Sequence, residues 1–271
     1  MNQRTKTIIF LIVLLLFFTS IVFMGVCFSE QAQITDFTRK NLAPDKQYWF
    51  GTDWLGRDMF LRTIRGLSIS ILIGIGASVV SAGIALVLGI LSALGGKKID
   101  AFITWIIDFI MGVPHILLLI LISVAVGRGV KGVVIGIIFT HWTSLARVIR
   151  GEILQLKEMP YILMARKLGK SSWYIGKTHM VPHVMPQFLA GLILLFPHAI
   201  LHEASITFLG FGLSNEQPAI GIILSESMKY LVTGKWWLAV FPGGLLVLTV
   251  ILFDLAGEGV RKLVSPYGTQ Q

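Results

Sequence analysis

Residues 164–182 read MARKLGKSSWYIGKTHMVP, a basic stretch between two long apolar parts of a 271-residue chain. It contains GKS and then GKT, each of which is the end of a phosphate-binding loop. A complete loop has the pattern GxxxxGK[ST], because a leading glycine lets backbone amides surround the phosphates between a strand and a helix. Here Met164 and Ser171 occupy the leading positions, and residues 147–168 have helical periodicity. We therefore expect this chain to have no ATPase site and no catalytic residues.

The composition on both sides of this stretch is that of a membrane protein. Hydrophobic residues make up 55% of the chain and charged residues only 14%, against about 25% charged residues in soluble domains. Because helices satisfy the backbone polar groups in lipid, we predict an all-α polytopic membrane protein with six transmembrane helices. The predicted spans cover residues 8–28, 68–94, 101–126, 130–145, 188–209 and 236–255. No A-x-A cleavage site follows the first span, which is expected to remain as an anchor.

The basic residues indicate orientation. Residues 1–6, the turn at Lys97 and Lys98, residues 147–186 and the tail after residue 255 hold 13 of the 23 Lys and Arg residues. This distribution predicts that both termini are cytoplasmic. The net charge of +9 does not indicate a nucleic acid partner, because the basic residues lie between apolar runs. Cys27 is the only cysteine, which excludes an internal disulfide and a thiolate metal site.

Two loops between the predicted spans mix apolar or aromatic residues with charged ones. Residues 147–186 mix apolar and basic residues, and Gly169 followed by serines predicts two short helices joined at a glycine elbow. Such a pair is either a membrane-surface element attracted to anionic lipid or a socket for a partner protein. On the other side, residues 48–58 read YWFGTDWLGRD. They are either an interfacial anchor or a docking or gating element.

The elbow has a recognisable pattern. Residues 161–169, YILMARKLG, together with Pro182 resemble the EAA loop of ABC-importer permeases, in which EAA is followed by three residues, Gly, nine residues and IxLP. Ala165, Gly169 and Pro182 match this pattern, whereas Leu163 replaces the glutamate and His179 the isoleucine.

Further stretches narrow the resemblance to the C-type permeases of dipeptide, oligopeptide and nickel importers. Matching segments occur at 50–58 (FGTDWLGRD), 207–212 (TFLGFG), 237–243 (WLAVFPG) and 253–261 (FDLAGEGVR), within a resemblance from about residue 48 to residue 266. It implies a type I ABC importer permease fold with cytoplasmic coupling helices. The domains expected are an anchor and outer loop (1–67), a permease core (68–260) with its coupling loop at about 147–186, and a cytoplasmic tail (261–271).

The resemblance also implies partners and roles. The partners are a second homologous permease, two ABC ATPase subunits, an extracytoplasmic substrate-binding protein and membrane lipid, all at a bacterial or archaeal cytoplasmic membrane. No cofactor in this chain is implied. In the family the loop is a pair of coupling helices that fits a groove in the ATPase, and Pro182 is expected to end the helical hydrogen bonding before the chain returns to the membrane. The residues assigned to coupling are Leu163, Ala165, Arg166, Gly169, Lys170, His179 and Pro182.

Ionisable residues inside spans suggest where cargo passes, because they are costly in lipid. They are Asp108, His115, His141, His198, His202, Glu203 and Asp254. His198 and His202 lie four apart on one helical face, whereas Glu203 lies about 100° around the helix. These three are our candidates for the substrate pathway, and no firm metal site is assigned. The two imidazoles either bind a metal or metal chelate transiently or hydrogen-bond to neighbouring helices and water. Asp108 and Asp254 are expected to cap helices or to pair with Lys97, Lys98 or Arg261.

The predicted function is that of a permease subunit that forms half of the pore for nickel, another metal, a metal chelate or short peptides. The His-x-x-x-His spacing resembles nickel-type members. One alternative is a self-sufficient carrier or channel, which inverted repeats would support, but no convincing repeat is present. Another is an intramembrane enzyme, yet the sequence contains no HExxH or paired-carboxylate motif.

Overall fold

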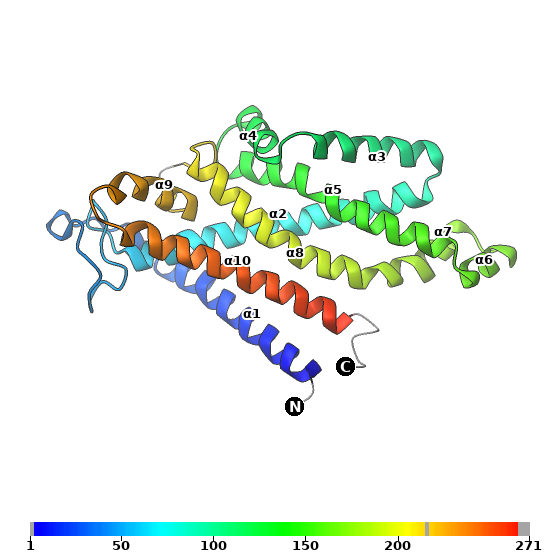
Figure 1. Cartoon of the computed structure of the whole chain (residues 1–271), viewed down its shortest axis with the longest axis horizontal. Helices are drawn as coiled ribbons and strands as arrows, with labels where there is room; N and C mark the ends of the chain where they lie inside the picture. Colours follow the sequence, from blue (N-terminus) through cyan, green and yellow to red (C-terminus); the bar gives the residue numbers. More distant parts are fainter. Residues whose placement is uncertain (1–2, 215–216, 265–271) are drawn as a thin grey trace.

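A computed structural model describes residues 3–214 and 217–264, which form a bundle of long helices with smaller helices at its two ends (Figure 1). The α-helices are α1 (Gln3–Cys27), α2 (Met59–Leu94), α3 (Lys97–Gly112), α4 (His115–Val126), α5 (Val130–Lys157), α6 (Pro160–Lys167), α7 (Ser172–Ile175), α8 (Val181–Phe208), α9 (Ile220–Leu231) and α10 (Trp237–Val264). Short 3-10 helices at Gln31–Gln33 and Phe37–Arg39 precede α2, and a π-helical turn at Gly176–Met180 precedes α8.

The structure contains five or six of the six predicted membrane-crossing segments. Among the described residues, five helical segments are long and apolar enough to cross a bilayer, and the bent pair α3–α4 makes a sixth if its two helices form one broken span. The continuous helix predicted over residues 101–126 is wrong, because α3 and α4 meet at an angle of 98°. Pro114 has no amide N–H and disfavours a helical conformation at the preceding residue. Val113 is accordingly extended, with φ −90° and ψ 137°.

Several predicted boundaries move because polar helix ends look like loops in the sequence. α2 begins nine residues early, at Met59, where the Asp58 carboxylate accepts hydrogen bonds from the N–H groups of Phe60 and Leu61. The predicted domain boundary at residues 67 and 68 therefore lies inside α2. α5 runs on to Lys157, and the predictions did not include α9. Residues 265–271 of the predicted tail lie outside the described residues.

The centre of the bundle is the contact of α2 with α5 and α8. Small residues recur every four positions along α2, at Ala77, Ser81, Ala85 and Gly89, and all four are buried. A Cβ atom added to Gly89 would lie 2.9 Å from the side chain of Ile149 on α5. Such stripes of small residues let membrane helices approach closely and associate through van der Waals contact.

The loops gather at two opposite ends of this bundle. Figure 1 places residues 28–58 and α9 at one end, whereas α6, α7 and the turn between α2 and α3 lie at the other. The start of α1 and the end of α10 point toward the α6–α7 end and meet at Thr7 and Gly259. The four segments rich in Lys and Arg are therefore on one side of the bundle, as the positive-inside argument requires.

At the other end, residues 48–58 form a packed cap. The Asp53 carboxylate is fully buried and accepts hydrogen bonds from Arg57 Nε at 2.7 Å and Arg62 Nη1 at 3.0 Å. Arg62 also reaches Glu226 on α9, with 2.5 Å between Nη2 and Oε2. The ring of Trp54 stacks on Tyr230 at 4.8 Å. These contacts connect the loop to α2 and α9, so it is a folded part of the protein.

Replacing Arg62 by glutamine is expected to lower the free energy of unfolding by about 3 kcal/mol, because the buried carboxylate of Asp53 loses one of its two arginine partners and Glu226 loses its ion pair with Arg62. Thermal unfolding of the purified protein in detergent measures this effect. The matched control is Arg147→Gln, which breaks an exposed ion pair with Asp108 and should cost less than about 1 kcal/mol. Equal losses for the two variants would show that the Arg62 contacts do not stabilise the cap.

Candidate transport cavity and coupling elbow

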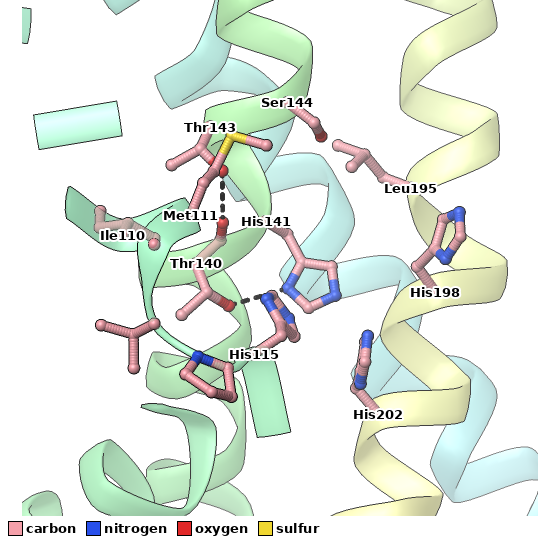
Figure 2. A pocket seen from close by; sticks show the side chains of 13 residues that line it. Ile110, Met111, His115, Thr140, His141, Thr143, Ser144, Leu195, His198 and His202 are labelled. Atoms are coloured by element: carbon pink, nitrogen blue, oxygen red, sulfur yellow. Dashed lines mark hydrogen bonds between the residues drawn. The ribbon is translucent and has the colours of Figure 1, made fainter. Parts of the chain in front are cut away.

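A cavity of about 590 Å³ lies between the start of α4, the middle of α5 and the middle of α8 (Figure 2). Its polar side chains are those of His115, Thr140, His141, Thr143, Ser144, His198 and His202. Among the described residues that line it, none carries an acidic group, a lysine or an arginine. The polar groups of this cavity are therefore imidazoles and hydroxyls, set among apolar side chains.

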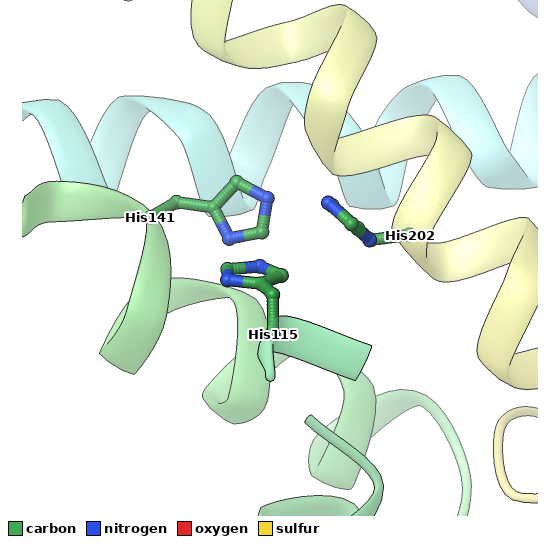
Figure 3. Close-up of side chains that lie close together, drawn as sticks. All are labelled: His115, His141 and His202. Carbon is green, nitrogen blue, oxygen red and sulfur yellow. The ribbon is translucent and has the colours of Figure 1, made fainter. Parts of the chain in front are cut away.

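Three of its imidazoles come together, each from a different helix. His115 is the first residue of α4, directly after the break at Pro114, while His141 and His202 lie on α5 and α8. The ring centroids are 4.8 Å apart for His115 and His141, 4.4 Å for His115 and His202, and 5.2 Å for His141 and His202. Figure 3 shows the three rings grouped around one space between these helices.

The orientation of His141 is fixed by hydrogen bonds within α5. Its Nδ1 atom lies 3.1 Å from the carbonyl oxygen of Ile137 and 3.0 Å from Oγ1 of Thr140. A carbonyl oxygen can only accept, so Nδ1 carries the proton in this contact. The second nitrogen, Nε2, is then an acceptor, and it is buried without a hydrogen-bond partner.

The structure separates the three residues that the sequence suggested for the substrate pathway. His198 and His202 both line the cavity. Glu203 does not; it is fully buried and accepts a hydrogen bond from Thr207 Oγ1 at 3.0 Å. The sequence argument did not place His115 and His141 at this site, although both were noted as ionisable residues inside spans.

The acidic residues of α3 also found unexpected partners. Asp108 pairs with Arg147 of α5 at 2.7 Å instead of with Lys97 or Lys98. Eight residues earlier on α3, Asp100 accepts two hydrogen bonds from the guanidinium of Arg150, at 2.6 and 2.7 Å. These two ion pairs connect α3 to the half of α5 that leads away from the cavity.

The glycine elbow predicted between two short helices is present. α6 ends at Lys167, and Gly169 follows with φ +76°. The N–H of Lys170 donates to Ala165 O at 3.1 Å and that of Gly169 to Arg166 O at 2.9 Å, which is the Schellman pattern of a helix end. Ser171 then caps α7 by accepting from the N–H of Tyr174. A left-handed conformation of this kind favours glycine.

One side of the elbow is anchored and the other is exposed. Ile162 and Ile175 are buried in the core of the bundle, and Ala165 packs against it. Leu168 and Trp173 are 72% and 80% exposed. Leu163, Arg166, Lys167 and Lys170 share the exposed surface. His179 is half-buried, with its ring 6.2 Å from that of Tyr161 and 6.3 Å from that of Tyr174.

The role expected for Pro182 is wrong. The helix does not stop there, because residues 172–208 form one continuous helical segment and Pro182 lies in the first turn of α8. A proline lacks the N–H for an intrahelical bond. The π-helical turn directly before it, in which Val181 N–H donates to Gly176 O, shifts the hydrogen bonding by one residue.

Similarity to known protein sequences identifies the family of this chain. The family described as "binding-protein-dependent transport system inner membrane component" matches residues 85–266. The chain belongs to this family. The permease is 31% identical to the dipeptide permease DppC of Bacillus subtilis, over 84% of this chain and 72% of DppC. It is 33% identical to the oligopeptide permease OppC of the same organism, over 94% of this chain and 84% of OppC.

A solved structure supports the same fold. A chain of the inward-facing MetNI methionine ABC transporter superposes on this permease with a TM-score of 0.62, covering 76% of this permease and 98% of that chain, at 19% sequence identity. The resemblance drawn from the sequence is thus confirmed: the chain is a multi-pass inner-membrane permease subunit of an ABC importer with the type I fold.

The cavity can be tested for water access with cysteine labelling. In a Cys27→Ser background, Ser144→Cys should react at least tenfold faster with a membrane-impermeant thiol reagent than Ser81→Cys, because Ser144 lines the cavity and Ser81 is fully buried against α5. The rate of labelling in membrane vesicles gives the answer. Equal rates at the two positions would contradict a water-filled cavity.

Proposed function

We propose that this permease forms half of the cargo pathway of a binding-protein-dependent importer, and that separate ATPases drive it through the elbow. The supporting observation is the connection between the elbow and the helices that line the cavity. The elbow joins the end of α5 to the start of α8, and these are the helices that carry His141 and His202. A push on the elbow is transmitted along two rigid helices to the cavity, which is a rigid-body route from ATP hydrolysis to alternating access.

The exposed surface of the elbow suits a protein partner. Leu168 and Trp173 offer apolar area, and Arg166 and Lys170 offer charge at its edge. Exposed aromatic residues with arginine are typical of protein interfaces. Arg166 and Lys170 are our candidates for polar contacts with the ATPase, whereas Ala165 and Gly169 set the shape. In this scheme both termini are cytoplasmic, and the chain itself hydrolyses no nucleotide and needs no resident cofactor.

The cavity favours a metal ion or a metal chelate as cargo. Imidazole nitrogens are ligands that nickel and zinc accept, and four histidines line this space. A second homologous permease would supply the opposite wall of the pathway, and an extracytoplasmic binding protein would deliver the cargo. Short peptides are the second candidate, because the relatives from Bacillus subtilis are named as dipeptide and oligopeptide permeases.

Replacing Gly169 by proline should abolish both uptake and co-purification of the ATPase. Proline fixes φ near −65° and has no N–H, whereas Gly169 has φ +76° and donates to Arg166 O. The matched control is Gly169→Asn, because asparagine tolerates the left-handed conformation. This variant should keep most of the uptake and most of the co-purification of the ATPase. Membrane insertion should be equal in the two variants. Normal uptake by the proline variant would contradict coupling through the elbow.

The cargo is tested by reconstituting the complete importer and comparing ATP-dependent uptake of nickel, chelated nickel and dipeptides. We expect uptake of the metal or its chelate, and a loss of at least tenfold in a variant with His198→Ala and His202→Ala, because both residues line the cavity. His183→Ala, on the same helix but outside the cavity, is the control. Uptake of dipeptides alone, unchanged in the double variant, would establish the second candidate.

A further inference from the structure

We propose that His115, His141 and His202 form a binding site for a single borderline transition-metal ion, of the class of Ni²⁺, Co²⁺ or Zn²⁺. This inference rests on the proposed function, because it names the cargo that the cavity holds during passage. The three residues come from three different helices and are separated by 26 and 61 positions in the sequence. No sequence motif connects them, and only the fold brings them together.

The spacing of the donor atoms suits one ion after a small adjustment. One ring nitrogen from each histidine lies within 4.8 Å of the other two. Nitrogens bound tetrahedrally to one ion at about 2.0–2.1 Å stand about 3.4 Å apart, so the widest pair closes by at most about 1.4 Å. The rings are inclined to one another by 44° to 79°, which excludes a parallel stack.

Two ring nitrogens of this cluster have no hydrogen-bond partner among the described residues. His141 is held with its Nδ1–H toward Ile137 O, which leaves Nε2 without a proton and without a partner. Nε2 of His115 is also buried without a partner. A hydrogen bond from one ring nitrogen to a backbone carbonyl is the arrangement that orients a metal-binding histidine. These two nitrogens are therefore available to a ligand or to water in the cavity.

The simplest competing explanation is a network of histidines that satisfy one another. Within residues 3–214 and 217–264, however, no hydrogen bond joins one of these three rings to another.

The chemistry of the side chains that line the cavity also favours some cations over others. Mg²⁺ and Ca²⁺ are usually bound through carboxylates, and the described lining contains no carboxylate. Neutral imidazoles favour the later first-row metals.

The position of the site fits an ion that is transported better than an ion that stays bound to the protein. Three protein ligands leave a coordination position open, and His198 lies one helical turn from His202 at the wall of the same cavity. Transport requires that binding be weak enough for release. Because the elbow joins the end of α5 to the start of α8, a movement that shifts these helices relative to one another would change the distance between His141 and His202. The site can therefore be opened by the same motion that is proposed to drive transport.

The test measures metal binding by the purified importer complex in lipid nanodiscs, by equilibrium dialysis with Ni²⁺, Co²⁺ and Zn²⁺. We expect one ion bound for each copy of this permease, and an increase of at least tenfold in Kd for each of His115→Gln, His141→Gln and His202→Gln. His183→Gln is the matched control, since it removes a histidine from α8 outside the cavity. Co-purification of all subunits and an unchanged melting temperature show that each variant is folded.

Two results would overturn this site. One is a wild-type complex that binds none of the three ions stoichiometrically, and the other is stoichiometric binding that all three variants retain. Either failure is distinguishable from failure of the proposed function, which appears as loss of ATP dependence for every cargo. A complex that imports dipeptides with ATP but binds no metal would remove the metal site and leave the coupling intact.

Discussion

The contact between α2 and α5 is the constraint on which the cavity and the elbow both depend. The hydrophobic effect does not drive helices together inside a bilayer, because the lipid tails are as apolar as the side chains. Close packing of small residues and a few hydrogen bonds must therefore hold the helices together. Ser81 of α2 donates to the carbonyl oxygen of Ile138 at 3.2 Å, and Lys157 at the end of α5 donates to Ala93 O. α5 is therefore fixed along its length, with His141 near its middle and the elbow at its end.

In the proposed scheme, this arrangement combines a passive path and an energy input in one chain. The buried isoleucines of the elbow attach it to the bundle, and its exposed surface is the part that we propose for contact with the ATPase. The ion pairs of α3 with Arg147 and Arg150 brace the same half of α5. At the far end, the buried Asp53 and Arg62 hold the cap against α9. The cavity lies between these two stiffened ends, at the break between α3 and α4.

Much of the fold could be predicted because its causes are local. Apolar runs predicted the spans, and Gly169 predicted the elbow, since a left-handed residue at a helix end is a property of a few neighbours. The failures have longer-range causes. The polar start of α2 is helical because Arg62 is neutralised by Asp53 and Glu226, and Glu226 is 164 positions away. His115 and His141 join His202 only because Pro114 breaks the span and α5 packs beside α8. Spacing within one helix cannot show such convergence.

Energy is proposed to enter this permease through the elbow. A photo-crosslinking amino acid at Trp173, 80% exposed at the elbow, tests it most directly in the assembled importer. The matched position is Val232, 91% exposed after α9 at the opposite end of the bundle. The account predicts an adduct with the ATPase from position 173 and none from position 232. Adducts with lipid alone from position 173 would contradict it and establish the elbow as a membrane-surface element.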